Sequence, residues 1–445
     1  MLTDQEGMEL EPKKVGRVAL LTESYPPQID GVSVASCNYA RYLQEDYDGA
    51  VVIVPNYRNE PETETCAPVV RYLSLDFQGQ LGYPVGVPTS PAIVRRLEQY
   101  PFSVIHMMSP MVSNMLGREL RMIYDVPQIL TYHTKFDEDI YRLVHSRPIA
   151  KTAISIMMSN INTCDEVWVV SHGAEENLRH LGYDRETFLM PNGTDLARRR
   201  STEEEIREVC AQANIPEGVP VLLFAGRIVR IKGLDLILEA VRILKDEGAD
   251  FRMVFVGDGM DKKEVIRRAE ELRVSDKCCF VPAEHDRERL RAWYTRADLF
   301  VFPSNFDTNG LVVREAAAAG TPSLLLRGSA AAEGIVDNVN GFLTEGSGKA
   351  LAERIRSIWN RRDFLRSVGE NASEQIYLSW KDAVAMAYER YAVVTENYKA
   401  GKYPPRKSSG DWIFRTQGRY MGLAVRRRSK RRLRSRSGWH RKKKS

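Results

Sequence analysis

The 445-residue chain has no long hydrophobic run: no uninterrupted apolar stretch approaches the roughly 18 residues of a membrane-spanning helix. Its first residues, MLTDQEGMELEPKK, are polar and acidic, whereas a secretory signal is basic and then apolar. We therefore expect neither a transmembrane helix nor a signal peptide. The protein is expected in the cytoplasm, with peripheral attachment to the inner face of the cell membrane as an option.

Cysteine is scarce as well, with six residues in the chain. They form no C-x-x-C pair and no other spacing typical of a metal site: Cys37, Cys66, Cys164, Cys210, Cys278 and Cys279. Reduced, mainly structural thiols of a reducing compartment are expected.

Several catalytic signatures are also missing. The sequence contains no G-x-S-x-G elbow, H-E-x-x-H pair or G-x-x-x-x-G-K-[ST] loop, which argues against the common hydrolase, zincin and P-loop mechanisms. Asp46-Tyr47-Asp48 has the D-x-D form that binds metal and nucleotide in a different transferase fold. Because it lies between an expected helix and an expected strand, we interpret it as a surface turn.

An even distribution of charge is lacking too. Residues 402–445 hold 17 Lys and Arg against one acid, Asp411, a net charge of +16. Since the whole chain carries +5, the other 401 residues carry −11. An acidic body is thus followed by a strongly basic tail.

Short apolar strands alternate with helical patterns along the chain. The first half contains "VGRVALLT", "GAVVIVPN", "PFSVIHMM", "PQILTYHT" and "CDEVWVVSHG", and the second contains "VPVLLFAG", "FRMVFVGDG", "KCCFVPA", "ADLFVFPS" and "GTPSLLL". This alternation predicts parallel sheets covered on both faces. At this length two domains are expected.

The expected fold class is α/β, with two doubly wound, Rossmann-like domains, a cleft between them and a basic C-terminal tail. The turn-rich, charged "LMPNGTDLARRRSTEEE" is interpreted as the linker. The expected boundaries are 1–195 for an N-terminal domain, 196–375 for a second domain, 376–400 for a closing helix and 401–445 for a disordered tail.

The stretch "FPSNFDTNGLVVREAAAAG" (302–320) has the pattern of an anion site. A strand leads into a loop, and Asn309-Gly310 precede an apolar helix whose free N–H groups and dipole favour a phosphate. Glu315, inside that helix, can accept hydrogen bonds from ribose hydroxyls, and Asp307 from a second polyol. A helix start with incidental acids is the alternative.

A second stretch, "FAGRIVRIKGLDLIL", places Arg227 and Lys232 after another strand, where two cations suit a diphosphate. In the first domain, Gly31 lies in a loop expected to face the cleft. His133 follows a strand and can bond a substrate hydroxyl, and Lys135 can meet an anionic group. Solvated charges and a core histidine are the alternatives, and "GDG" at 257–259 is interpreted as a turn.

Together these motifs resemble the retaining glycosyltransferases of the GT-B fold, specifically family 4, over residues 15–395. The resemblance is carried by "YPPQIDGVSV", "TYHT", "VSHGAEENLRHLG" and "MPNGTD", then "GRIVRIKG", "VGDG", "ADLFVFPS", "NGLVVREAAAAGTP" and "GIVDNVNGFL" in order. It implies an acceptor role for residues 1–195, a nucleotide-sugar role for residues 196–375 and a helix after Trp380 that crosses back to the first domain.

The resemblance also implies the roles of individual residues. The donor, a nucleotide diphosphate sugar, would be bound by Gly31, Arg227, Lys232, Asp307, Asn309, Gly310, Leu311 and Glu315. The residues closest to the chemistry would be His133, Arg227, Lys232 and Asp307, and Lys135 would meet the acceptor. No metal and no other cofactor is required, because cations and the helix start would stabilise the leaving diphosphate. The first acid of the family's E-x7-E motif is here the shorter Asp307, which leaves the sugar open.

The partners expected are a nucleotide-sugar donor, with a UDP-hexose first among the candidates, and a lipid or glycan acceptor. The tail mixes Trp412, Phe414, Tyr420 and Leu423 with cations, which favours an anionic membrane surface over nucleic acid or a solvated tail. A non-catalytic nucleotide-sugar-binding protein and a sugar-nucleotide epimerase of the same fold are the alternative functions. A phosphorylase is disfavoured, since no lysine motif suits pyridoxal phosphate.

Overall fold

The computed structural model describes residues 14–28, 30–57, 64–75, 84–87, 91–143, 146–307 and 309–404. The chain forms two compact units. The described part of unit 1 lies within Met1–Val170, Ala174–Met190 and Val384–Ser445, and unit 2 comprises Ser171–Gly173 and Pro191–Ala383. Most of the basic tail, from residue 405 onward, lies outside the described residues.

Unit 1 is built on a parallel sheet whose strand order, within the described residues, is β3-β2-β1-β6-β7-β8-β9. Strands such as "VALL" and "AVVIVP" are buried at every position, as expected for a parallel sheet covered on both faces. The strands are β1 (Val18–Leu21), β2 (Ala50–Pro55), β3 (Val69–Tyr72), β6 (Val104–Met107), β7 (Gln128–Tyr132), β8 (Glu166–Val169) and β9 (Phe188–Leu189).

The helices of unit 1 connect these strands, and a short antiparallel pair, β4 (Ser74–Leu75) and β5 (Val85–Gly86), adds a second small sheet. The helices are α1 (Gly31–Asp46), α3 (Pro91–Leu97), α4 (Val112–Tyr124), α5 (Phe136–Leu143), α6 (Arg147–Ile161) and α7 (His172–His180), the last of which begins in unit 2.

Unit 2 repeats the pattern with a second parallel sheet, ordered β12-β11-β10-β13-β14-β15 in the part of the chain that the structure describes. Its strands are β10 (Val221–Ala225), β11 (Arg252–Val256), β12 (Cys278–Val281), β13 (Leu299–Phe302), β14 (Ser323–Leu326) and β15 (Phe342–Thr344). They form an apolar core with the helices on either side.

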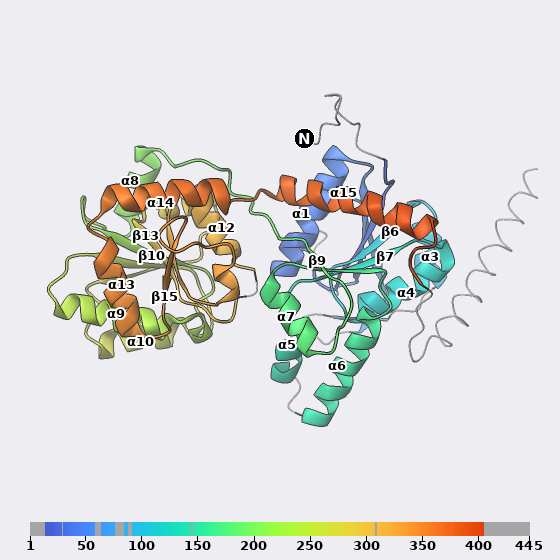
Figure 1. Ribbon diagram of the computed structural model, residues 1–445, viewed down its shortest axis with the longest axis horizontal. Helices are drawn as coiled ribbons and strands as arrows, with labels where there is room; N and C mark the ends of the chain where they lie inside the picture. The colour runs from blue at the N-terminus through green and yellow to red at the C-terminus, as the bar shows by residue number, and fades with distance from the viewer. Residues whose placement is uncertain are drawn as a thin grey trace, which may run out of the picture. The chain divides into compact units, whose positions relative to one another are not determined.

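Helices cover both faces of this second sheet, which is therefore doubly wound (Figure 1). On one face lie α9 (Leu234–Asp246), α10 (Lys262–Glu271) and α13 (Gly348–Ile358), and on the other α8 (Glu203–Gln212), α11 (Arg287–Arg296), α12 (Leu311–Ala318) and α14 (Arg362–Gln375). Two 3-10 turns, η1 (Arg230–Lys232) and η2 (Ala330–Ala332), complete the unit. The predicted α/β class with two Rossmann-like sheets is confirmed.

The closing helix, α15 (Trp380–Lys399), begins in unit 2 and packs against unit 1 from Val384 onward. The Arg390 guanidinium donates to both carboxylate oxygens of buried Glu166, at 2.9 and 2.7 Å. The Tyr391 hydroxyl lies 2.5 Å from Nδ1 of buried His106. Tyr388 donates to Asp48, whose carboxylate also accepts from the Gly16 N–H. The second acid of Asp46-Tyr47-Asp48 therefore fastens a turn to α15.

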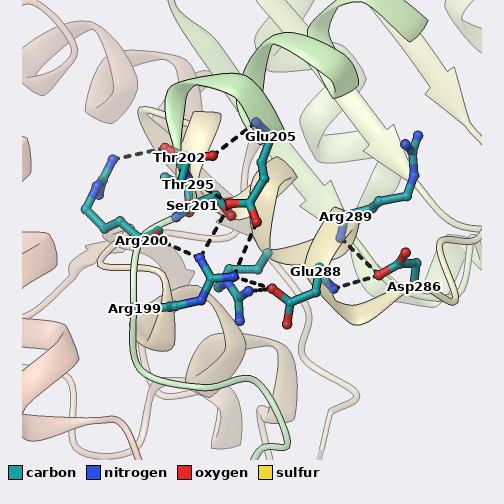
Figure 2. Close-up of polar contacts among 10 residues, drawn as sticks. Arg199, Arg200, Ser201, Thr202, Glu205, Asp286, Glu288, Arg289 and Thr295 are labelled. Carbon is teal, nitrogen blue, oxygen red and sulfur yellow. Dashed lines mark hydrogen bonds and ion pairs between the residues drawn. The ribbon is translucent and has the colours of Figure 1, made fainter.

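The charged segment interpreted as a linker is bonded into unit 2. The Arg200 guanidinium donates to the backbone oxygens of Thr295, Ala319 and Gly320. Arg199 pairs with Glu205 and Glu288 (Figure 2). Thr202 and Glu205 form a capping box that starts α8. These charges fix the path of the chain into the second sheet instead of keeping it loose.

Two segments of unit 2, one shortly after Pro191 and one shortly before Ala383, cross each other backbone to backbone. The Thr194 N–H donates to Leu378 O at 2.8 Å, and the Trp380 N–H donates to Thr194 O at 3.2 Å. A Cβ on Gly193 would lie 2.4 Å from the Trp380 nitrogen, so only glycine fits at this crossing. Across the described ranges, no helix has the length and apolarity to span a bilayer.

Candidate functional site

The strand order of unit 2 predicts where a ligand binds. From β10 the chain moves outward to β11 and β12 and then returns to the other side of β10 at β13, so the order reverses between β10 and β13. Ligands of doubly wound sheets bind beyond the carboxyl ends of the strands at such a reversal. The two loops at this point contain most of the donor residues predicted from the sequence.

These two loops pack directly against each other at Gly233. Its φ of +77° is a left-handed conformation, and a Cβ there would lie 2.0 Å from the Pro303 carbonyl oxygen. Glycine is required on both counts. The "GDG" stretch supports the first loop in the same way, because Cβ atoms on Gly257 and Gly259 would lie 2.0 Å from Gly226 O and 2.3 Å from Ile228 O.

Lys232 and Asp307, predicted from separate motifs, meet across the two loops. The Lys232 ammonium lies 3.4 Å from Asp307 Oδ2 and 5.1 Å from the centroid of the Phe302 ring. The two side chains are only 12% and 20% exposed, so the pair is partly shielded from water. Asp307 Oδ1 accepts the N–H groups of Gly310 (2.9 Å) and Asn309 (3.3 Å).

Helix α12 begins beside this pair with no side chain capping it. Its N-cap, Gly310, has a φ of +56°, and Leu311 is the first helical residue. Within the described ranges, the buried Nδ2 of Asn309 has no hydrogen-bond partner. A helix start together with this amide donor suits an anionic group. Arg227, exposed after Gly226, adds a cation at the end of β10.

Glu315 lies further along α12, with its side chain 15% exposed. Its Oε1 is 2.7 Å from Nη2 of Arg287, and its Oε2 accepts the Tyr294 hydroxyl at 2.8 Å. Arg287 also pairs with Asp195. Burial, and secondly the Glu315 charge, raise the pKa of Tyr294 well above its ordinary value. Sequence reasoning missed Arg287 and Tyr294, since an Arg and a Tyr on a charged helix carry no distinguishing pattern.

In unit 1, the structure places Gly31 at the start of α1, after the end of β1. The N-cap Asp30 accepts the Ser33 N–H at 2.8 Å and the Ser24 hydroxyl at 2.5 Å. A Cβ at Gly31 would meet no atom within 4 Å, so the space beside this glycine is open.

His133 follows β7 directly and is almost completely buried. Burial lowers its pKa to about 3, so the imidazole is neutral at pH 7. Lys135, two residues on, pairs with Glu138 at 3.4 Å on the surface of α5. His106 has a structural role that its sequence context does not reveal. Its Nε2 lies 2.7 Å from the Thr131 hydroxyl, and its Nδ1 meets the Tyr391 hydroxyl.

The structure thus gathers Arg227, Lys232, Asp307, Asn309, Gly310 and Leu311 at one strand reversal of unit 2, with Glu315 on the helix that starts there. It places Gly31, His133 and Lys135 after strands of unit 1. Across the described parts of the chain, no group of His, Cys, Asp and Glu residues could hold a metal ion. All six cysteines are free thiols.

Two doubly wound domains, with cation–acid loops and an uncapped helix start in the second, define the class of GT-B glycosyltransferases. Residues 205–375 match the family model for glycosyl transferases group 1, and residues 29–198 match that for glycosyltransferase family 4. The chain belongs to this family and is a glycosyltransferase.

Individual relatives agree with this assignment. The chain is 27% identical over 300 residues to D-inositol 3-phosphate glycosyltransferase of Xylanimonas cellulosilytica, covering 62% of this chain and 69% of the relative. It is 23% identical to the alpha-monoglucosyldiacylglycerol synthase of Streptococcus pneumoniae, covering 69% and 70%. The HepE protein of Anabaena, solved in complex with UDP, shares the fold with a TM-score of 0.68 at 17% identity over 85% of this chain and 100% of HepE.

Proposed function

We propose that the protein transfers a hexose from a nucleotide diphosphate sugar, with UDP-sugars first among the donors, to a lipid or glycan acceptor with retention of the anomeric configuration. The observation that carries the proposal is the shielded Lys232–Asp307 pair at the strand reversal of unit 2, beside the uncapped start of α12. The UDP bound by HepE and the glycolipid product in the name of the streptococcal relative, monoglucosyldiacylglycerol, support the donor and acceptor classes.

In this proposal Lys232 turns from Asp307 to the diphosphate when the donor binds. Arg227, the Asn309 amide and the N–H groups at Gly310 and Leu311 complete the anion site. As the bond to the sugar breaks, negative charge grows on the leaving diphosphate, and these fixed donors stabilise it without a metal ion. Asp307, released from Lys232, accepts hydroxyls of the sugar, and Glu315 accepts those of the ribose.

In the same proposal, three residues of unit 1 serve the sugar and the acceptor. Gly31 leaves open space for the diphosphate, neutral His133 bonds a sugar hydroxyl, and Lys135 meets the acceptor. A neutral imidazole cannot act as a cation, so its role is that of a hydrogen-bonding partner. The acceptor hydroxyl can pass its proton to the leaving phosphate, which removes the need for a dedicated base.

The test is a donor panel. UDP-, GDP- and ADP-hexoses are screened by thermal shift, and the stabilising donor is incubated with membrane extracts and followed by mass spectrometry. We expect one nucleotide class to raise the melting temperature and a glycosylated lipid or glycan to form.

Lys232→Ala should lower product formation by about two orders of magnitude, since it removes a cation that stabilises the transition state. Asp235→Asn, which alters an exposed pair with Arg230 nearby, is the matched control.

Binding without product in any extract would identify a non-catalytic sugar-nucleotide protein. An altered sugar nucleotide in the absence of acceptor would identify an epimerase. Unchanged transfer by Lys232→Ala would show that the assigned pocket is wrong.

A further inference from the structure

Among the residues that the structure describes, the Glu315 carboxylate is bonded only by side chains of α11. Tyr294 and Arg287, both on α11, approach its two oxygens at 2.8 and 2.7 Å. An ionised carboxylate offers about four lone-pair positions, and these contacts use one on each oxygen. One acceptor position therefore remains on each oxygen, which is the number needed by two neighbouring hydroxyls.

The two partners of Glu315 are themselves fixed. Tyr294 is completely buried, and the Thr321 hydroxyl donates to its backbone oxygen at 2.6 Å. The Nη2 of Arg287 that meets Glu315 is also bound by Asp195, which belongs to the segment that enters unit 2 beside the Thr194–Leu378 contact. The carboxylate thus has a set orientation before any ligand arrives, and this lowers the cost of binding.

We propose that Tyr294 and Arg287 are positioning residues for the ribose of the donor nucleotide: they hold Glu315 so that its two remaining lone pairs accept the 2′- and 3′-hydroxyls. This inference rests on the proposed function, in which Glu315 binds the ribose. The competing explanation is that the three residues only fasten α11 to α12. Contacts that only join the two helices contribute to stability, but their loss would not change the ratio of the affinities for a ribonucleotide and its deoxy analogue.

The experiment measures nucleotide binding by the full-length protein with isothermal titration calorimetry. The probes are UDP, 2′-deoxy-UDP and 3′-deoxy-UDP, or the GDP or ADP series if wild type prefers that base. The variants are Tyr294→Phe, Arg287→Gln, Arg287→Lys and Glu315→Gln. Arg289→Gln is the matched control, because Arg289 lies on the same helix but contacts Glu284 and Gln212.

In wild type, removal of either hydroxyl should weaken binding about tenfold, as for loss of a hydrogen bond to a charged group. Tyr294→Phe and Arg287→Gln should each bind the ribonucleotide about fivefold more weakly than wild type does. In these variants, removal of a ribose hydroxyl from the ligand should weaken binding by no more than about twofold, because a carboxylate that is no longer held in place does not present both lone pairs. Arg287→Lys should restore part of the wild-type discrimination, and Arg289→Gln should match wild type.

Wild-type discrimination in both Tyr294→Phe and Arg287→Gln would overturn the inference, whatever happens to the melting temperature. If Tyr294→Phe does not fold, the half-exposed Arg287 variants decide the question alone. Glu315→Gln distinguishes failure of the proposed function from failure of the inference about Tyr294 and Arg287. If this variant keeps wild-type discrimination, the ribose is bound elsewhere and the proposed pocket fails with the inference; if it loses discrimination while the Arg287 variants keep it, only the inference fails.

Discussion

At the scale of single residues, Asp307 has two tasks that depend on its length. Oδ1 accepts the N–H groups of Asn309 and Gly310, and Oδ2 faces Lys232. An aspartate two or three residues before these N–H groups is the usual geometry of an Asx turn, which a glutamate with one more methylene fits poorly. The shorter acid is therefore explained by its local turn as well as by any sugar contact.

We predict that Asp307→Asn lowers kcat/KM by about tenfold to a hundredfold, while the affinity for the free nucleoside diphosphate changes less than about threefold. The amide keeps the turn but loses the charge that bonds sugar hydroxyls. Steady-state kinetics and calorimetry with the preferred donor and its diphosphate measure the two effects. An equal loss of affinity for diphosphate and donor would contradict a role confined to the sugar.

Glu119 on α4 gives a pH-dependent prediction. It is completely buried, neither carboxylate oxygen has a hydrogen-bond partner in the described part of the protein, and burial raises its pKa from 4.5 to about 7. Between pH 4.5 and 7 the folded protein retains a proton that the unfolded chain loses, so this group's contribution to stability is complete below pH 4.5 and is lost as the pH rises through 7.

The free energy of unfolding of wild type should therefore fall, relative to Glu119→Gln, by about 3 kcal/mol at most between pH 5 and 8. Urea unfolding at several pH values measures this difference. Glu176→Gln, which changes an exposed carboxylate on α7, serves as the control and should run parallel to wild type. Parallel curves for Glu119→Gln would mean that Glu119 titrates normally.

At the scale of elements, the contact between the two donor loops depends on a missing side chain. Gly233 and Gly218 have nearly the same φ, +77° and +74°, but a Cβ at Gly218 would meet nothing within 4 Å. The two glycines therefore separate the cost of a left-handed backbone from the cost of a steric clash.

Gly218→Ala should lower the free energy of unfolding by about 1 kcal/mol, the usual cost of alanine in this conformation. Gly233→Ala should lower it by more than about 3 kcal/mol and also reduce nucleotide affinity, because the loop bearing Lys232 must move away from Pro303. Denaturant unfolding and calorimetry on both variants test this. Equal losses of stability would show that the loops are not in contact.

Prediction from sequence worked best for elements with a strong period. Runs such as "VALL" and "LFVF" are apolar at every position, and only a strand buried on both faces needs that pattern. Prediction from sequence was weaker for elements whose existence or ends depend on tertiary contacts. The short strands β3 and β9 went unnoticed, and the closing helix expected at 376–400 begins only at Trp380, after α14 has ended at Gln375.

At the scale of the whole molecule, the main feature is the uneven distribution of charge between the body of the chain and its C-terminal tail. Residues 1–401 carry a net charge of −11, and the tail from Lys402 carries +16. An anionic bilayer attracts each nearby Lys or Arg by about 1 kcal/mol, over a screening distance of about 8 Å at physiological salt. The tail lies largely outside the described residues, so its partner stays a prediction from sequence.

We predict that removal of residues 405–445 weakens binding to anionic liposomes by at least tenfold, and that added salt weakens binding of the full chain in the same direction. Hydrolysis of soluble donor should be unaffected. Replacing Trp412, Phe414, Tyr420 and Leu423 by serine keeps the charge of the tail. This variant therefore distinguishes electrostatic attraction to the bilayer from insertion of apolar side chains into it. Liposome sedimentation is the measurement, and full binding by the truncated chain would exclude the tail as an anchor.

The sequence by itself determined the two α/β domains, the loops after β10 and β13 and the acids and cations on them, because burial of parallel strands and the chemistry of strand ends leave local patterns. Only the tertiary structure decided that Lys232 faces Asp307, that His133 is buried and neutral, and that Tyr294 and Arg287 hold Glu315. Those pairings join residues that are distant along the chain, and no local periodicity records which side chains a fold will bring together.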